Sequence, residues 1–598
     1  MKKIIVLLLC VLTVLSVFSA CSKDLENEDV GATIPIYLST EIANFDPAYA
    51  NLDDASSKVL GLLYEGLFRI DEDGDVVKAQ AKSIKVLDDP DDDYYAIEIK
   101  LDDTCWSDGT QVQAADYIYA WKRILEPGFR GEAASMLFDI KNARAVNSGD
   151  ASIDDLGVSD VTSDVIKIEF EGEIDYDKFY EYLASPMLVP LRENTVGKVD
   201  KDWSSNSSIV VSNGPFCVRT FTPGEKLVLE RNRYYYRDQE EDSIKKYVTP
   251  YRLVINFKND TTENFEEFEA GNLVYNAELP LDKRAEYKDE AEIVDTMSVL
   301  SCIFNTTVAP FDNADVRNAL SLAIDRNEIV KILTFAKPAS GLIADGVFNT
   351  EYGRKADSFR EAGEELISAS ANVTAAKELL KKAKVSGGNI TLTLRKNDAD
   401  KAVAEYIKTV WEELGFTVKL ETLGFRKYTD KVKEYDLVSD KYLEAYETGD
   451  FQVILADYQM LTTDAFPNLA QFAKAFAGGK MNMDIGENED GTESEDDYEL
   501  VPHVSGYYSA DYDAKIEEAF AQKTDLDARA ALLHQAEKML LADMPIMPLV
   551  QLQHAYLETD DISKIGDLSY FGFNYFEDAV LKNVSKYPEN EGYETAAK

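Results

Sequence analysis

Residues 390–414, ITLTLRKNDADKAVAEYIKTVWEEL, contain the pattern that decides the fold class of this chain. The first part, Ile390–Arg395, is rich in apolar and β-branched residues and is predicted to be a strand. The second part, Ala399–Leu414, carries apolar residues at helical spacing and is predicted to be a helix. A strand followed closely by a helix is the repeating unit of α/β proteins.

The same succession of strands and helices continues on both sides of this segment, without an internal repeat. Further strands are predicted at Thr33–Leu38, Ile166–Phe170, Lys226–Glu230, Tyr251–Phe257 and Phe451–Ala456. Further helices are predicted at Ala114–Leu125, with Asp116 placed to cap it, at Val316–Leu333, with Asp315 as its N-cap, at Ala375–Ala383 and at Ala528–Ala542. The chain is therefore predicted to have an α/β fold.

The first residues indicate export and attachment to a membrane. Two lysines precede an apolar run from Ile4 to Ala20, which is the pattern of a secretory signal peptide. Cys21 follows small residues and resembles the lipidated cysteine of bacterial lipoproteins, so residues 1–20 are predicted to be a lipoprotein signal peptide. The alternative is one transmembrane helix, for which the run is at the short limit. Residues 21–33 are predicted to be an acylated, solvated tether that two acyl chains would hold stably.

Length and charge limit what the rest of the chain does. The 598 residues are too many for one hydrophobic core, and the 45% hydrophobic and 11% aromatic content is typical of globular domains. No second apolar run approaches membrane length. The net charge of −48 argues against nucleic acid or an anionic membrane surface as a partner, because both need clustered Lys and Arg.

Cysteines and acidic runs add little functional information. Cys105, Cys217 and Cys302 allow at most one disulfide, whose pair the sequence does not specify, and buried free thiols are an equal alternative. The Asp-Gly turn in Asp71–Asp75 predicts a hairpin, and its spacing does not fit a calcium loop. The acidic stretch 484–497 is predicted to be a surface loop.

Segments spread over nearly the whole chain resemble the extracytoplasmic oligopeptide-binding lipoproteins of ABC peptide importers, the family 5 solute-binding proteins. Their order and spacing are those of the family, and each segment alone is a weak signal. The segments are Asn44-Phe45-Asp46-Pro47, Leu63-Tyr64-Glu65-Gly66-Leu67, Trp106-Ser107-Asp108-Gly109-Thr110, Ala115–Arg123, Ser212-Asn213-Gly214-Pro215-Phe216, Pro223-Gly224-Glu225, Leu229–Asn232, Phe304-Asn305-Thr306, Pro310-Phe311, Val316–Leu320, Ala323-Ile324-Asp325-Arg326, Ala456-Asp457-Tyr458, Tyr508-Ser509 and Pro545–Pro548.

The resemblance implies a two-lobed periplasmic-binding-protein type II clamp with an additional α/β domain. Lobe I would comprise 31–65, 206–304 and 546–598, the additional domain 66–205, and lobe II 305–545. Strands near Ser301–Phe304 and Met544–Leu549 would cross between the lobes. Such a monomer would enclose its ligand when the lobes close and would deliver it to ABC transporter permease subunits.

The resemblance also implies where the ligand binds. In the family the segment Ala-Asp-Tyr after a strand supplies a carboxylate for the α-amino group of a peptide, and Asp457 and Tyr458 stand at that position. The loops Ala48–Asp54 and Tyr275–Leu279 match ligand-contacting segments, which makes Asn51, Tyr275 and Asn276 candidate ligand-binding residues. The peptide backbone is the part that all peptides share, so hydrogen bonds to it give affinity without sequence preference.

Several residues depart from the family pattern near the pocket: Val453-Ile454-Leu455 replace an expected Trp and Gly before Ala-Asp-Tyr, and Val274 stands where an acidic residue is usual. Alternative ligands are therefore a nickel chelate, haem or an oligosaccharide, and a peptide-sensing surface lipoprotein is an alternative role. Motifs of nucleophilic hydrolases and nucleotide-binding enzymes are absent from the sequence, and its three histidines lack metal-ligand spacing. We expect no catalytic residues, no cofactor and no metal, and His534 is predicted to be a surface or packed residue.

Overall fold

The computed structural model describes most of the chain between residues 31 and 590. The residues outside the description are 1–30, 40–41, 43, 53, 130, 198–202, 206, 224, 236–246, 258–260, 354–355, 431–434, 478–479, 483–497, 501, 567–568 and 591–598. The predicted signal peptide, the lipidation site Cys21, most of the tether and the acidic stretch 484–497 thus lie outside the described residues.

An 11-stranded mixed sheet runs through the described part of the molecule in the order β15-β14-β18-β12-β21-β11-β1-β10-β9-β8, with β13 beside β21. The pairs β14–β15, β14–β18, β1–β10 and β1–β11 are parallel, and the others are antiparallel. The strands are β1 (Thr33–Tyr37), β8 (Phe216–Thr222), β9 (Lys226–Arg231), β10 (Arg252–Asn256), β11 (Tyr275–Asn276), β12 (Glu292–Phe304), β13 (Ala336–Pro338), β14 (Gly388–Arg395), β15 (Phe416–Leu423), β18 (Val453–Gln459) and β21 (Ile546–Glu558).

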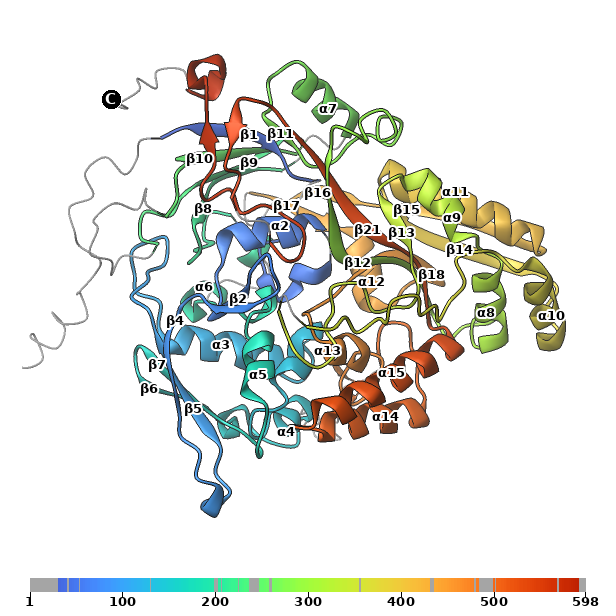
Figure 1. The fold of residues 1–598 in the computed structure, drawn as a ribbon, viewed down its shortest axis with the longest axis horizontal. Coiled ribbons are helices and arrows are strands. Elements are labelled where there is room, and N and C mark those ends of the chain that lie inside the picture. Colours follow the sequence, from blue (N-terminus) through green and yellow to red (C-terminus); the bar gives the residue numbers. More distant parts are fainter. Residues whose placement is uncertain are drawn as a thin grey trace, which may run out of the picture.

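The strands β12 and β21 connect the two halves of this sheet. Each has 13 residues, and together they run diagonally through the centre of the molecule (Figure 1). They pair antiparallel from Glu292–Tyr556 to Ile303–Ile546, with register shifts between Asp295 and Val299 and between Leu300 and Ser301. The predicted crossing segments, near Ser301–Phe304 and Met544–Leu549, include one end of this pair. The break in the ladder lies nearer its middle, where a loss of regular pairing allows bending.

Helices cover the half of the sheet that contains the parallel strands β14 and β15. On the right of Figure 1 lie α8 (Ala314–Leu322), α9 (Arg326–Leu333), α10 (Val373–Ala383) and α11 (Asp398–Glu413), while α14 (Ala510–Ala521) and α15 (Leu526–Asp543) lie lower, at the bottom of the molecule. Trp411 of α11 is fully buried and donates its indole N–H to the carbonyl of Leu320 at 3.3 Å. The predicted strand–helix unit at 390–414 is therefore confirmed, and burial of its apolar face is what holds α11 in place.

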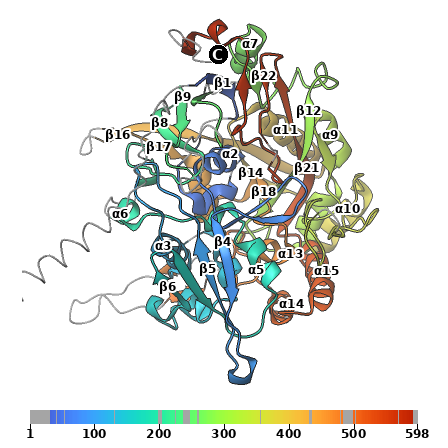
Figure 2. The same ribbon diagram turned by 60° about the vertical axis from the view of Figure 1, so that its left-hand side comes forward.

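A second, four-stranded sheet stands apart, in the order β4-β5-β7-β6, and extends downward in Figures 1 and 2. It is antiparallel and is accompanied by short helices. Its elements are β4 (Ala81–Val86), β5 (Ala96–Leu101), β6 (Val158–Thr162), β7 (Val165–Glu169), α3 (Ala114–Leu125), α4 (Ala143–Ser148), α5 (Tyr176–Tyr182) and α6 (Glu193–Val196). All of these elements fall inside the segment 66–205 that the family resemblance implies for the additional domain, whose boundaries remain a prediction.

A buried ionic network joins this segment to the helical side of the molecule. Arg529 of α15 donates hydrogen bonds of 2.8 Å to both carboxylate oxygens of Asp464 and one of 2.8 Å to the hydroxyl of Tyr182. Glu181 accepts from the backbone N–H of Thr463 at 2.7 Å. Burial raises the pKa of Glu181 to about 8, and the charge of Asp464 adds to the rise. These contacts hold α5 against α15, and the charges of Arg529 and Asp464 both stay buried.

Several local predictions need correction. The helix expected over Val316–Leu333 is two helices, α8 and α9, because the side chain of Asp325 accepts from the N–H of Asn327 and starts a new helix there. Asn313 caps α8, and the expected cap Asp315 lies in its first turn.

The predicted cap of the helix Ala114–Leu125 is present in a modified form, and the predicted hairpin at Asp71–Asp75 is present as expected. The helix α3 has Gln113 as N-cap, and Asp116 completes the cap by accepting from the N–H of Gln113 at 2.9 Å. The turn Asp71–Asp75 is the predicted hairpin, between β2 (Phe68–Ile70) and β3 (Val76–Lys78).

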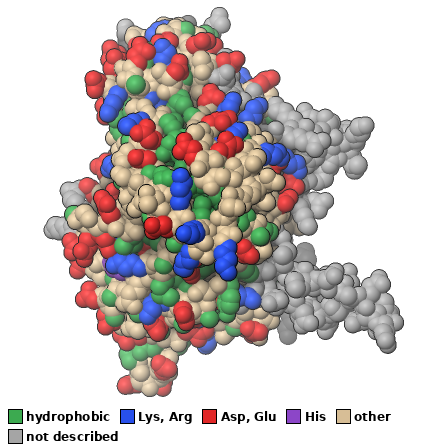
Figure 3. All heavy atoms as spheres, turned by 90° about the vertical axis from the view of Figure 1, so that its right-hand side faces the viewer, with side chains coloured by type: hydrophobic (Ala, Val, Ile, Leu, Met, Phe, Trp, Pro, Cys, Tyr) green, Lys and Arg blue, Asp and Glu red, His purple; other side chains and the backbone are tan. Residues whose placement is uncertain are grey.

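Among the cysteines, Cys217 and Cys302 are free thiols, so no disulfide joins them to each other or to Cys105. In the described residues no helix is both long and apolar enough to cross a membrane. Figure 3 shows acidic side chains spread over the whole of one face, with lysines and arginines scattered among them. This distribution agrees with the net charge of −48.

The other α-helices and strands of the described residues each have ten residues or fewer. They are α2 (Asp54–Leu63), α7 (Thr261–Glu269), α12 (Lys441–Thr448), α13 (Ala465–Ala470), β16 (Phe425–Asp430), β17 (Tyr435–Asp440), β19 (Lys480–Asn482), β20 (Tyr498–Leu500), β22 (Ile562–Ser563) and β23 (Val580–Leu581).

Candidate ligand-binding cleft

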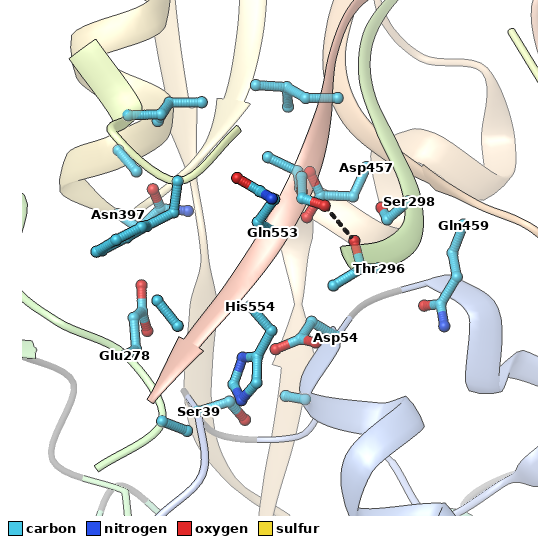
Figure 4. Close-up of a pocket in the computed structure, with 18 of the residues that line it drawn as sticks. Ser39, Asp54, Glu278, Thr296, Ser298, Asn397, Asp457, Gln459, Gln553 and His554 are labelled. Carbon is cyan, nitrogen blue, oxygen red and sulfur yellow. Dashed lines mark hydrogen bonds between the residues drawn. The ribbon is translucent and has the colours of Figure 1, made fainter. Parts of the chain in front are cut away.

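A cavity of about 200 Å³ lies beside the crossing strands β12 and β21. Its walls come from both sides of the crossing: from α2 and the 277–284 segment on one side, and from β18 and the start of α11 on the other. The charged side chains that line it are Asp54, Lys58, Glu278, Arg284, Arg395, Asp400 and Asp457. Figure 4 shows Asp457 and Glu278 on either side of the strand that carries Gln553 and His554.

Asp457 reaches this cavity from the middle of β18. The strand pairs with β12, where Asp457 lies opposite Leu300, so the strand does not end before Asp457 as its sequence suggested. Asp457 is the one exposed residue of β18, while its neighbours Ala456 and Tyr458 are buried. The alternation of a strand therefore aims the carboxylate of Asp457 out of the core and toward the cavity.

A second carboxylate, Asp400, belongs to the first turn of α11 and lines the same cavity. Burial raises the pKa of Asp400 to about 7, and the negative charge of Asp457 adds to the rise. Arg395 opposes it, but Arg395 also holds Asp440 at 3.1 Å. This wall of the cavity thus concentrates negative charge, which favours a cationic group on the ligand.

The opposite wall contains a cation that is already paired. The ammonium of Lys58 lies 2.6 Å from a carboxylate oxygen of Asp54 and 3.4 Å from Nδ1 of His554. Burial lowers the pKa of His554 well below its usual range, and the Lys58 charge acts in the same direction. His554 is therefore neutral at physiological pH and offers the cavity a hydrogen-bonding ring.

The other cation on this wall is Arg284, in the loop after β11. Its Nε donates to the carbonyl of Leu279 at 3.1 Å and its Nη1 to the carbonyl of Leu333 at 3.0 Å. Its Nη2 lies 4.0 Å from Glu278, whose other carboxylate oxygen accepts from the Tyr37 hydroxyl at 3.0 Å. Burial lowers the pKa of Arg284, and Glu278 opposes the shift.

The structure places the other candidate residues behind the cavity walls. Tyr275 is buried, and its hydroxyl donates to Asn574 at 3.0 Å and lies 3.4 Å from Nε2 of His554. Asn276 is fully buried and donates to the carbonyl of Glu278 at 3.0 Å. Tyr275 supports a residue that lines the cavity, and contact of either residue with a ligand stays a prediction.

Asn51 and Tyr458 lie near Asp457 in a small second hollow of about 10 Å³. Asn51 is in a 3-10 turn, Pro47–Leu52, where a loop was expected, and donates to Glu132 at 2.6 Å. Tyr446 donates to the same carboxylate at 3.2 Å. The hydroxyl of the buried Tyr458 donates to the carbonyl of Asn468, away from the cavity.

Sequence reasoning did not single out Asp400, Arg284, Lys58 or His554. No local signal distinguishes Asp400 among the 110 acidic residues, because only the fold, in which α11 packs on β14 and β14 pairs with β18, brings it to Asp457. His534, in α15, stacks on Phe359 with ring centroids 4.1 Å apart, as a packed histidine. Within the described residues no group of three His, Cys, Asp or Glu side chains is arranged to hold a metal ion.

A mixed α/β molecule with two halves joined by crossing strands, and a charged cavity beside those strands, defines a two-lobed solute-binding clamp. Residues 75–480, more than half of the chain, match the family model of bacterial extracellular solute-binding proteins, family 5. The protein belongs to this family, as its sequence segments predicted.

Similar proteins agree with this assignment. The chain is 27% identical over 538 residues to the dipeptide-binding protein DppE of Bacillus subtilis, covering 88% of each chain. It is 27% identical over 568 residues to the oligopeptide-binding protein OppA of the same organism, covering 92% of this chain and 93% of that one. The substrate-binding domain of an oligopeptide ABC transporter from Bacillus anthracis has the same fold, with a TM-score of 0.75 and 22% identity over 94% of this chain and all of that one. The predicted type II clamp is confirmed.

Proposed function

We propose that this protein is a lipid-anchored receptor that captures oligopeptides between its two lobes and delivers them to the permease of an ABC importer. The observation that carries the proposal is the exposed carboxylate of Asp457, aimed into a cavity between the two sides of the crossing strands. The names of the similar proteins, a dipeptide-binding and an oligopeptide-binding protein, support peptides as the ligand class.

In this proposal Asp457 pairs with the α-ammonium group of the peptide. A charge-assisted hydrogen bond is strong in a cavity that excludes most water. Polar side chains that line the cavity, among them Gln459 and Gln553, are suited to bind the peptide backbone directly or through water. The site then fixes one end of the peptide and tolerates varied side chains.

The domain layout and location are part of the same proposal. Lobe I would be 31–65, 206–304 and 546–598, lobe II 305–545 and the additional domain 66–205. Acylation of Cys21 would hold a monomeric receptor at the extracytoplasmic face of the cell membrane, near its permease. The protein would act by binding and release, not by catalysis.

A panel of ligands tests the ligand class. A ligand that binds only the folded state raises the melting temperature in proportion to RT ln(1 + [L]/Kd). Mixed tri- to pentapeptides are expected to raise it, while a nickel chelate, haem and an oligosaccharide leave it unchanged. A rise with one of those three and none with peptides would overturn the proposal. Loss of peptide uptake on deletion of the gene separates a transport receptor from a peptide-sensing lipoprotein.

A further inference from the structure

A second cavity lies on the helical side of the molecule, apart from the cleft. Its volume is about 310 Å³, against about 200 Å³ for the cleft, and the two cavities share no lining residue. Its walls come from α8, the first residue of α9, the segment 366–370 and the C-terminal end of α15. All of these residues lie within 305–545, the segment proposed as lobe II, so the cavity does not depend on closure of the clamp.

A buried cation, Arg326, lines this second cavity. Only 2% of Arg326 is exposed, and it makes no ion pair with a described residue, whereas the buried Arg529 pairs with Asp464 at 2.8 Å. Burial lowers the pKa of Arg326 to about 10, which still leaves its guanidinium group charged at neutral pH. A buried positive charge that the surrounding residues do not pair favours an anion from outside the protein.

The hydrogen bonds of Arg326 hold its side chain in place and leave donors available. Nε donates to the carbonyl of Pro548 at 2.9 Å, Nη1 to the carbonyl of Ser368 at 3.0 Å and Nη2 to the hydroxyl of Ser321 at 3.0 Å. A guanidinium group has five N–H donors, so one N–H remains on each Nη atom. Ser321 also lines the cavity, is 4% exposed and donates its own hydroxyl hydrogen to no acceptor among the described residues. These donors are available to an anion in the cavity.

The rest of the cavity wall indicates what kind of anion fits. Beside the polar groups, the wall contains the apolar side chains of Leu322, Leu366, Ile367, Leu541 and Met544. An inorganic anion would leave this apolar surface in contact with water, whereas an organic anion with an apolar body covers it. A carboxylate suits the guanidinium group, because its two oxygens accept from two N–H donors of one plane. The cavity volume also falls in the range of roughly 300–1,000 Å³ that small-molecule sites commonly have.

We propose that this cavity is a second ligand site, which binds a small carboxylate with an apolar body through Arg326 and Ser321. The site lies within one lobe and takes its ligand independently of a peptide in the cleft. The inference goes beyond the proposed function, because neither site supplies a residue to the other.

Calorimetry with three probes tests the proposal: hexanoate, hexan-1-ol and acetate, each titrated into the intact protein at neutral pH. Hexan-1-ol keeps the apolar body without the charge, and acetate keeps the charge without most of the body. Hexanoate is expected to bind at least roughly tenfold more tightly than either, because it alone makes both the charged hydrogen bonds and the apolar contacts. A saturating concentration of trialanine should leave the affinity for hexanoate unchanged.

Two variants locate the binding. Ala542→Trp places a large side chain at the wall of the cavity, from an exposed position that leaves Arg326 and its bonds intact, and should weaken hexanoate binding at least roughly tenfold. The matched control is Ala531→Trp, at an exposed position of the same helix that does not line the cavity, and it should keep the parent's affinity. Arg326→Gln removes the charge and should bind hexanoate and hexan-1-ol about equally. If the loss of its hydrogen bonds unfolds Arg326→Gln, the comparison of the two tryptophan variants still decides.

Three results would overturn the inference. The first is a parent protein that binds hexanoate no more tightly than hexan-1-ol or acetate. The second is a folded Ala542→Trp that keeps the parent's affinity for hexanoate. The third is displacement of hexanoate by trialanine, which would place the acid in the cleft. Failure of the proposed function is a separate observation, in which peptides do not bind whatever hexanoate does.

Discussion

Replacement of Asp457 by Asn tests the amine-binding role with the least disturbance of the fold. Asn has the same shape, and Asp457 is the exposed residue of β18, so the strand and its pairing with Leu300 should persist. The variant loses the charge in a charge-assisted hydrogen bond, which contributes roughly 1.5–3 kcal/mol. Peptide affinity should therefore fall by about ten- to 150-fold.

Because of Asp400, we expect the loss of peptide affinity to lie near the lower end of this range. Burial and then the charge of Asp457 raise the pKa of Asp400 to about 7. Removal of the Asp457 charge lowers that pKa, so that more Asp400 is ionised at neutral pH and still attracts the ammonium group. The double variant Asp457→Asn/Asp400→Asn should lose more affinity than the two single losses added together.

The assay is calorimetry with trialanine and N-acetyl-trialanine. The parent should prefer the free amine strongly, and Asp457→Asn should lose most of that preference. Asp315→Asn is the control, because Asp315 pairs with Lys382 at 3.0 Å on the helical side of the molecule and does not line the cavity. An equal preference for the free amine in the parent and in Asp457→Asn would refute the reasoning.

Three further predictions concern stability. Asp400→Asn should raise the thermal midpoint at pH 8 by roughly 1–3 °C and leave it unchanged at pH 3.5. The reason is that the raised pKa of Asp400 makes the folded state lose stability as the pH rises from 3.8 to about 7. Calorimetry that shows an equal gain at both pH values would contradict this prediction. Arg529→Met should destabilise the protein by roughly 3–5 kcal/mol in urea denaturation, because Asp464 is left buried without its partner, and a midpoint equal to the parent's would disprove it. Asn51→Ala should cost about 1–3 kcal/mol, because Tyr446 is then the one hydrogen-bond donor that the described residues leave to Glu132. Thermal midpoints identical to the parent's would show that the Asn51 bond contributes nothing.

The sequence predicted those parts of the fold that depend on local pattern. The strand Ile390–Arg395 and the helix α11 appear where expected, because a buried apolar face determines both. The helix over Val316–Leu333 was wrong in one respect: apolar spacing continues through Asp325, but the capping bond of that side chain divides the helix. The capping residue was visible in the sequence, but the regular spacing of apolar residues on both sides of it favoured one continuous helix.

The cleft was predictable only in part. Asp457 follows an apolar strand and matches a family segment, so the sequence indicated it. Arg284 and Asp400 reach the cavity through the packing of a loop and a helix from distant parts of the chain, which no spacing in the sequence reveals. Tyr275 and Asn276 matched a ligand-contacting loop, but they lie in β11, where pairing with β1 and β21 buries both side chains.

The most direct test of the central claim is to identify what the protein carries when it is purified. Mass spectrometry of ligand released by denaturation of the folded, untreated protein answers this without any choice of candidate. We expect a mixture of short peptides with free amino and carboxyl termini. A single sugar, metal chelate or haem in stoichiometric amount would contradict the account.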